Sequence, residues 1–260
     1  MARTDPLFIQ SLAKGLGLLE AFRGQPAPLT LNDLSEQSGL DRSTTQRMAH
    51  TLVALGYLER GSNGRGYVPG KKILDCAFDY LRSVPLLERA TPLIVELQKD
   101  SGERVELSLF DDLTIVFALR RQTKRQTYTT TLIGRRLATL HTAGGRAIMA
   151  HLTDAQNDDI LARAADTPVL PMTPKAIKDP ARIRELIEEA RANGYAMAAE
   201  ESMLGEINLA CAVTDHDERP IAAIHISGSL AEWTMEDFAK RFSPLILGAA
   251  RALSGKRGLS

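Results

Sequence analysis

Two helix starts lie close together in Thr30-Leu-Asn-Asp-Leu-Ser-Glu-Gln-Ser-Gly-Leu-Asp-Arg-Ser-Thr-Thr-Gln-Arg47. Thr30, with an acidic residue three positions later, is an N-cap candidate, and the helix that it opens ends at Gly39. Asp41 can cap a second helix that runs to Leu55. Two short helices joined by a glycine-containing turn are typical of a helix-turn-helix unit.

The residues on both sides of this segment predict a helix before it and a hairpin after it. Apolar residues at helical spacing precede it, at Leu12, Leu16, Leu19 and Phe22. Two short strand-like runs, 57–60 and 66–68, follow it, and the Asn63-Gly64 pair between them is a strong hairpin signal. Three short helices and a hairpin in this order are typical of a winged helix-turn-helix, so we expect residues 1–70 to form a DNA-binding domain.

The second helix of the pair is the expected recognition helix. A duplex major groove admits one helix, and polar or cationic side chains in its first turns can reach base edges. The residues expected to contact DNA from this helix are Arg42, which suits a phosphate, Arg47, which suits guanine, and the hydroxyl residues Ser43, Thr44 and Thr45. On the hairpin, Arg60 and Arg65 would lie beside the DNA backbone. The alternative is a three-helix domain that binds protein instead of DNA.

A change of pattern near Pro85 divides the chain. Apolar side chains at helical spacing predict a helix from Lys71 to Ser83. Residues 85–260 mix strand-like and helix-like runs, which predicts a second domain and the α+β class for the chain. The expected helices lie at 86–99, 154–165, between Asp179 and Gly194, and at 234–253, and the expected strands lie at 105–110, 113–119, 207–213 and 220–226.

Composition narrows the class of protein. The chain has 260 residues, of which 44% are hydrophobic and 25% charged, as is usual for a folded globular protein. No run approaches the roughly 20 apolar residues that cross a bilayer, and Asp5 and Pro6 interrupt any apolar signal segment at the start. We therefore expect a cytoplasmic protein with no membrane partner. The two cysteines, Cys76 and Cys211, are too few for a disulfide framework or a cysteine zinc site.

Charge is balanced over the whole chain but not along it. The 32 basic residues equal the 32 acidic ones. Residues 42–72 contain one acid, Glu59, among six Lys and Arg side chains. Residues 113–153 contain no acid, and their basic residues are Arg120, Arg121, Lys124, Arg125, Arg135, Arg136 and Arg146. Such stretches bind DNA or anionic ligands, or they are solvated faces that pair with acids elsewhere.

Short motifs occur in one consistent order along the chain. In the first part they are Gln10-Ser-Leu-Ala-Lys14, 29–40, Arg42-Ser-Thr-Thr-Gln-Arg47 and Leu55-Gly-Tyr-Leu-Glu-Arg60. In the second part they are 103–107, 134–150, Gly194-Tyr195, Glu200-Glu201, Gly205, 208–213 and 223–228. In this order and spacing the chain resembles, over nearly its whole length, the IclR family of bacterial transcriptional regulators. Gly145-Arg146, where many members have Gly-Lys, is similar to relatives that govern aromatic-acid breakdown.

The resemblance implies an architecture, a partner set and a ligand site. It implies a winged helix at 1–70, a linker helix at 71–84 and, at 85–260, a domain similar to the GAF fold that binds a small effector. Family members are dimers or tetramers that bind palindromic double-stranded operator DNA as activators or repressors, and the expected effector is a small organic acid, with aromatic acids among the candidates. The implied effector-binding residues are Thr142, Ala143, Gly144, Glu200, Asn208, Cys211, His225 and Ser227.

The acidic pair at Glu200-Glu201 does not suit a carboxylate ligand. An ionised acid facing the pocket would repel the ligand, so we expect it to accept a hydrogen bond from an effector hydroxyl or to pair with Arg120 or Arg121. Which of the two acids faces the pocket stays open at this point.

Enzymatic and metal-binding alternatives have less support. Cys211 and His225 would be the nucleophile and base of a hydrolase, but nothing in the sequence brings them together or supplies an oxyanion hole. Residues 15–20 lack the third glycine and the preceding strand of a dinucleotide fingerprint, and neither His-x3-His nor Cys-x2-Cys spacing occurs. We expect no catalytic residue, metal or cofactor. The remaining alternative is a module that binds small molecules or protein and has no DNA affinity.

Overall fold

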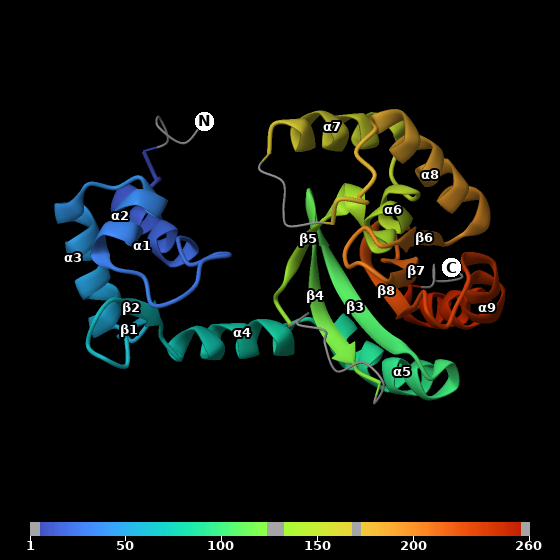
Figure 1. Ribbon diagram of the computed structural model, residues 1–260, viewed down its shortest axis with the longest axis horizontal. Coiled ribbons are helices and arrows are strands. Elements are labelled where there is room, and N and C mark those ends of the chain that lie inside the picture. The colour runs from blue at the N-terminus through green and yellow to red at the C-terminus, as the bar shows by residue number, and fades with distance from the viewer. Residues whose placement is uncertain (1–5, 124–132, 168–172, 256–260) are drawn as a thin grey trace. The chain divides into compact units, whose positions relative to one another are not determined.

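The computed structural model describes residues 6–123, 133–167 and 173–255, and the chain folds as two compact units, Met1–Ser83 and Val84–Ser260 (Figure 1). The first unit is mainly helical, and the second builds helices on a six-stranded sheet. The predicted α+β class, with a helix-turn-helix followed by a mixed domain, is therefore confirmed. Within the described ranges, no helix combines the length and apolar character needed to cross a membrane.

The first unit has the predicted order of elements, namely α1 (Gln10–Glu20), α2 (Leu31–Ser38), α3 (Arg42–Ala54), β1 (Leu58–Arg60), β2 (Tyr67–Pro69) and α4 (Lys72–Ser83). Local sequence explains the boundaries. Thr30 Oγ1 accepts a hydrogen bond from the Asp33 N–H, and the Asp33 carboxylate accepts one from the Thr30 N–H, which closes a capping box on α2. Gly39 ends α2 in the left-handed conformation, and Asp41 caps α3 by accepting from the N–H of Thr44.

The core of the first unit joins its three leading helices to the hairpin through Leu18, Leu34, Leu52, Leu58 and Tyr67. The apolar stripe of α1 is only partly used by this core. Leu12 and Leu16 remain 59% and 55% exposed, whereas Leu19 and Phe22 pack against the core. Helix α4 has no buried residue at all.

The second unit contains one antiparallel sheet in the order β5-β4-β3-β8-β7-β6. Its strands are β3 (Arg104–Asp111), β4 (Thr114–Arg121), β5 (Arg136–Ala138), β6 (Ala196–Ala199), β7 (Glu206–Thr214) and β8 (Pro220–Ser229). Its helices are α5 (Pro85–Ser101), α6 (Ala143–Met149), α7 (Asp154–Ala165), α8 (Pro180–Asn193) and α9 (Met235–Leu253), with a short 3₁₀ turn at Thr139–His141. The two edge strands β5 and β6 were not expected, because neither the short run of β5 nor the alanine-rich run of β6 carries a strand pattern.

Alternation along the strands separates the two faces of this sheet. On one face, α6 packs closely on β7 and β8 through small residues, namely Ala143, Ala147, Ala210, Ala212 and Ala223. On the other face, α9 covers the same strands. Its Phe238 ring packs so closely on Gly228 that a Cβ added there would lie 2.6 Å from the ring. The central strand β3 contacts α5 and α6, and its polar residues Arg104, Glu106 and Ser108 are buried, whereas Asp111 at its end is exposed.

Candidate functional sites

Helix α3 presents a polar face to solvent in the first unit. Ser43, Gln46 and Arg47 are exposed in its first turns, and His50 is exposed one turn further on. Arg42 is also exposed, and its Nη1 donates to Asn32 Oδ1 of α2 at 2.6 Å. Sequence reasoning missed Gln46, although it stands directly beside Arg47 and its amide can pair with an adenine edge.

The two threonines of α3 have different environments, and one of the predicted DNA contacts is wrong. Thr45 is fully buried, and its hydroxyl donates to the Asp41 carbonyl at 2.9 Å within its own helix. Because this side chain packs on the core side of α3, it cannot reach a base edge. Thr44 is half-buried at the capped end of the helix and remains a candidate DNA contact.

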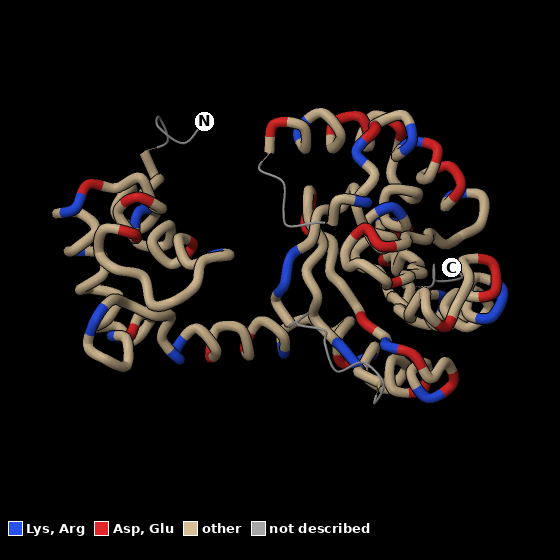
Figure 2. The backbone as a smooth tube through the Cα atoms, viewed as in Figure 1, with Lys and Arg blue, Asp and Glu red and all other residues tan. Residues whose placement is uncertain are grey.

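The β1–β2 hairpin carries the two arginines expected on the wing. Arg60 and Arg65 are both exposed, and the Arg60 guanidinium lies 4.3 Å from the centre of the Tyr67 ring. The Asn63 side chain accepts from the Arg65 N–H at 3.0 Å, which shapes the tip of the turn. In Figure 2 some basic positions of this unit lie on α3 and the hairpin, and others lie on and just after α1 and at the start of α4.

A small cavity of about 20 Å³, partly open to solvent, lies in the second unit between the sheet and the start of α6. It is lined by Arg104, Glu106, Phe117, Arg135, Leu137, Thr142, Ala143, Ser202, Met203, Glu206, Asn208 and His225. Four of the eight expected effector residues are therefore cavity residues: Thr142, Ala143, Asn208 and His225. Two more support this set, since Gly144 lies against the His225 ring and Ser227 donates to Asn208 Oδ1 at 2.6 Å.

The expected roles of Glu200 and Cys211 in this cavity are wrong. The Glu200 carboxylate forms an ion pair with Lys175 and accepts from the Gly205 N–H, and these two contacts hold the pKa of Glu200 below its usual value. Cys211 Sγ donates to the Gly194 carbonyl at 3.1 Å, and burial raises the pKa of this thiol to about 11. Neither residue lines the cavity.

Strand alternation explains the Cys211 error. Asn208 and Cys211 are three residues apart on β7, so their side chains point to opposite faces of the sheet. In the register of β7 with β8, Cys211 pairs with Ile224 and Ala210 pairs with His225, which places the thiol and the imidazole on opposite faces. The nucleophile–base pair considered for a hydrolase is not formed.

The second acid of the pair, Glu201, is buried and bound to Arg146 rather than to Arg120 or Arg121. Arg146 Nη2 lies 2.5 Å from Glu201 Oε1, and both side chains are almost completely buried. Glu201 Oε2 also accepts from the Ile177 N–H at 3.1 Å. The pair ties α6 to the segment that follows β6.

The basic run at 113–153 does not form one patch among the described residues. Arg146 is buried in its ion pair with Glu201, Arg136 pairs with Asp111, and Arg135 lines the cavity. Two members of the run, Lys124 and Arg125, lie outside the described residues.

A charged network on the cavity floor was missed by sequence reasoning. Arg104 Nε lies 3.0 Å from Glu106 Oε2, Arg104 also pairs with Glu206, and Arg120 Nη1 lies 3.6 Å from Glu106 Oε1. Burial raises the pKa of Glu206 despite the opposing effect of Arg104. Burial by itself would lower the pKa of Arg104, but the two carboxylates outweigh it and raise that pKa. The available signal was the spacing of Arg104 and Glu106, two residues apart on one buried strand.

His225 is a neutral hydrogen-bonding group within this cavity. Burial, reinforced by the nearby Arg104 charge, lowers the pKa of His225 to about 3. Its Nε2 lies 2.7 Å from Ser108 Oγ, and its ring centre is 5.4 Å from that of Phe117. A Cβ on Gly144 would come within 2.1 Å of the His225 ring, so a glycine is needed there for α6 to approach the sheet.

Helix α6 begins at Ala143 behind the cap residue Thr142. Thr142 Oγ1 accepts from the Gly145 N–H at 3.0 Å, so this amide of the first turn has a partner within the protein. The expected glycine-bearing loop is thus already helical at Ala143 and Gly144. Its contribution to the cavity is a wall of small residues.

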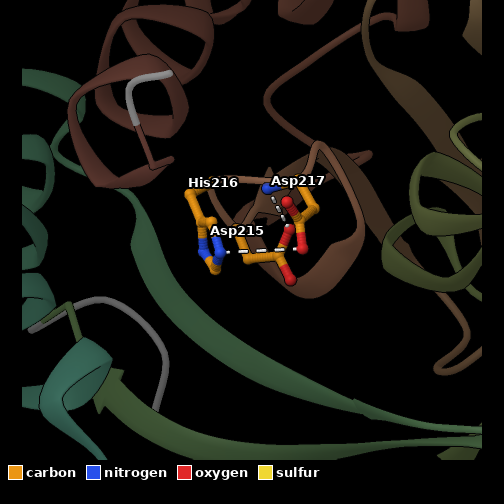
Figure 3. Close-up of side chains that lie close together, drawn as sticks. All are labelled: Asp215, His216 and Asp217. Atoms are coloured by element: carbon orange, nitrogen blue, oxygen red, sulfur yellow. Dashed lines mark hydrogen bonds and ion pairs between the residues drawn. The ribbon is translucent and has the colours of Figure 1, made fainter. Parts of the chain in front are cut away.

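Within the part of the chain that the structure describes, one group of potential metal ligands lies in the turn between β7 and β8: Asp215, His216 and Asp217 (Figure 3). The Asp215 carboxylate accepts from the N–H groups of Asp217 and Arg219, both at 2.9 Å. These bonds are those of an aspartate that stabilises a turn. The group accounts for the hairpin geometry without a bound ion.

Comparison with known proteins identifies both units. Residues 11–62 match the IclR helix-turn-helix domain, and residues 78–255 match the bacterial transcriptional regulator IclR C-terminal domain. The Pca regulon regulatory protein of Pseudomonas putida is 29% identical over 250 residues, which cover 96% of this chain and 84% of that relative.

Two solved structures extend the comparison. A transcriptional regulator from Rhodococcus sp. RHA1 superposes with a TM-score of 0.78 at 27% identity, covering 95% of this chain and 97% of the other. An IclR homologue of Microbacterium hydrocarbonoxydans, solved with 4-hydroxybenzoate, has a TM-score of 0.75 at 22% identity, with coverages of 94% and 99%. This chain belongs to the IclR family of bacterial transcriptional regulators.

Proposed function

We propose that this protein regulates transcription by binding a palindromic operator as a symmetric oligomer, and that a small organic acid in the second unit controls that binding. Residues 1–70 would read the DNA, 71–84 would link the domains and 85–260 would hold the effector. The observation that carries the proposal is the polar, exposed face of α3 on a helix whose opposite face is core. Family membership supplies the regulatory context.

In this proposal the side chains of α3 and the hairpin divide the recognition of DNA between them. Arg47, at an exposed position in the second turn, would read a guanine, with Ser43 and Thr44 contacting neighbouring base edges. Arg42 would contact a phosphate at the start of the helix. The hairpin arginines Arg60 and Arg65 would add phosphate contacts that carry no sequence information.

The lining of the cavity offers polar and apolar partners to an organic acid, and the cavity would have to widen to admit one. Arg135 lies in its lining and can attract a carboxylate, Arg104 already pairs with Glu106 and Glu206 there, and Asn208 and neutral His225 add polar contacts. Phe117 and the other apolar lining residues favour an acid with an aromatic ring. The homologue solved with 4-hydroxybenzoate and the Pca regulon relative support an aromatic acid and the aromatic-catabolism subgroup.

Exposed apolar side chains support a homo-oligomer. On α1, Leu12 and Leu16 face solvent, and on α4, Leu74 and Phe78 are 69% and 58% exposed. A 12-residue helix with no buried residue is marginal in water, so α4 gains stability if a second copy covers it. A dimer with two-fold symmetry, alone or paired into a tetramer, also matches a palindromic operator.

The related proteins are regulators, which favours a non-enzymatic role, with no catalytic residue, metal or cofactor. Binding to operator DNA in a bacterium implies a cytoplasmic location.

Footprinting of the DNA upstream of the protein's own gene cluster tests the proposal. We expect protection of two half-sites related by a two-fold axis, with protection changed by an acid found in a thermal-shift screen of aliphatic and aromatic acids. No protection at low salt, with or without the stabilising acids, would contradict DNA recognition. If the operator is protected but none of the screened acids stabilises the protein, acid sensing is contradicted and DNA recognition is not.

A further inference from the structure

We infer that Glu106 selects effectors that carry a hydroxyl group in addition to their carboxylate, by accepting a hydrogen bond from that hydroxyl. The inference rests on the proposed function and makes it more specific. It names a chemical class, the hydroxylated organic acids, and assigns the selection to one oxygen atom of this chain.

Glu106 has one engaged and one available carboxylate oxygen. Oε2 receives the hydrogen bond of Arg104 Nε at 3.0 Å. Oε1 accepts no hydrogen bond from the described residues, and its ion-pair partner Arg120 Nη1 is 3.6 Å away. The side chain is only 2% exposed and lines the cavity. A buried carboxylate oxygen without a hydrogen bond is costly, so a donor on a bound ligand would satisfy it.

Three other polar side chains of the lining, those of Glu206, Asn208 and His225, already have hydrogen-bond partners within the protein. Glu206 is paired with Arg104 through one oxygen, and its second accepts from Asn208 Nδ2 at 3.4 Å. Asn208 Oδ1 accepts from Ser227 at 2.6 Å. His225 Nε2 and Ser108 Oγ bond to each other at 2.7 Å. Of these groups, Glu106 Oε1 is the one left to recognise a donor on the ligand.

The neighbouring charges explain why the ligand should be an acid as well as a donor. Arg135 lines the same cavity as Glu106, so a molecule with a carboxylate at one end and a hydroxyl at another can contact both kinds of group. An acid without the hydroxyl leaves Glu106 Oε1 unsatisfied and buried. Sites that bury a polar group for one substrate discriminate strongly against the analogue that lacks the partner atom.

Calorimetric titration of the full-length protein with matched pairs of acids tests this inference. The pairs differ by one hydroxyl: 4-hydroxybenzoate and benzoate, 3-hydroxybenzoate and benzoate, malate and succinate, lactate and propionate. We expect the wild-type protein to bind the hydroxylated member of at least one pair about tenfold or more tightly. Because a charge-assisted hydrogen bond is roughly twice as strong as a neutral one, Glu106→Gln should reduce that preference to about threefold. Glu106→Leu, which removes the acceptor, should abolish it.

Glu206→Gln is the matched control, since it removes the same charge from the same cavity but from a carboxylate whose oxygens already have partners. It should keep the tenfold preference even if both affinities change. Thermal melting of each variant shows that it is folded, and Glu106→Gln keeps the test valid if the leucine variant does not fold.

Each outcome distinguishes the inference from the proposed function. Binding of acids without a hydroxyl preference, or loss of the preference in Glu206→Gln as well, would overturn the inference and leave acid sensing intact. Operator binding by a protein that binds none of the acids would overturn both acid sensing and the role of Glu106. A preference that falls only in the Glu106 variants establishes the inference.

Discussion

Adjacent residues with the same chemistry have opposite environments in this protein. Thr44 remains at the surface of α3, whereas Thr45 is buried and bonds its own helix. Glu200 is bound to Lys175 outside the cavity, whereas Glu201 is buried against Arg146. The side-chain direction leaves Thr44 but not Thr45 able to face DNA, and neither acid lines the cavity.

At the residue scale, Arg47 and Arg65 should differ in what they contribute to DNA binding. Arg47→Ala should remove about 1–3 kcal/mol of preference for the operator over unrelated DNA, because a guanine-reading contact carries sequence information. Arg65→Ala should weaken binding to all DNA sequences about equally. It should also reduce the salt dependence of binding by about one released counterion, as expected for a phosphate contact. Affinity measurements on operator and scrambled DNA at several salt concentrations test both. Uniform losses in both variants would contradict the assignment.

Gly144→Ala should destabilise the second unit by about 1–3 kcal/mol, because the added methyl group would meet the buried ring of His225 at 2.1 Å. Gly248→Ala is the control. It adds the same methyl group to a helix, but nothing lies within 4 Å of its Cβ position, so it should be neutral or stabilise by up to about 1 kcal/mol. Urea unfolding of both variants compares them, and equal effects would show that close packing of α6 on His225 is unimportant.

At the scale of elements, small residues and one buried ion pair hold α6 in place beside the cavity. Alanines on α6 and the sheet allow the close approach, and Arg146 binds Glu201 in the segment after β6. Because Ser202 and Met203 of that segment line the cavity together with Thr142 and Ala143, the pair positions two walls of the same site.

Arg146→Met should therefore cost about 3–5 kcal/mol, because it leaves the Glu201 carboxylate buried without its guanidinium partner. The double variant Arg146→Met with Glu201→Leu should regain much of this loss, since no buried charge remains. Denaturant unfolding of the single and double variants provides the comparison. A double variant as unstable as the single one would indicate that the lost packing of Arg146, and not the orphaned charge, is responsible.

At the scale of the whole molecule, each compact unit carries one part of the proposed function, and the first unit leaves apolar surface uncovered. On α4 the exposed apolar residues Leu74 and Phe78 are each followed by an aspartate. A partner helix must therefore bury the two apolar side chains while leaving the charges in water. A second copy of the chain meets this requirement by symmetry.

Phe78→Glu should weaken self-association at least about tenfold, since a carboxylate would enter an apolar contact between copies. Asp75→Asn changes a charged position on the same helix and should leave the oligomer intact. Sedimentation equilibrium of wild type and both variants measures the association constants. An unchanged association constant in Phe78→Glu would place the interface elsewhere.

Local sequence was sufficient for the helices of the first unit, its hairpin and the longer helices of the second unit, but not for α6, β5 or β6. Capping by Thr30, Asp33 and Asp41, the turn at Asn63-Gly64 and the helix limits around Asp179 and Gly194 all act over a few residues, so they are readable without the fold. The motifs of the family are also contiguous stretches, which is why membership was accessible from the chain alone.

The cavity itself required the tertiary structure. Arg104 and Glu206 are more than 100 residues apart and meet only because β3 and β7 both pair with β8. Long-range pairing and burial set the strand register and the face of the sheet that each helix covers. These in turn determine that His225 enters the cavity, that Cys211 does not, and that one oxygen of Glu106 has no hydrogen bond within the described residues.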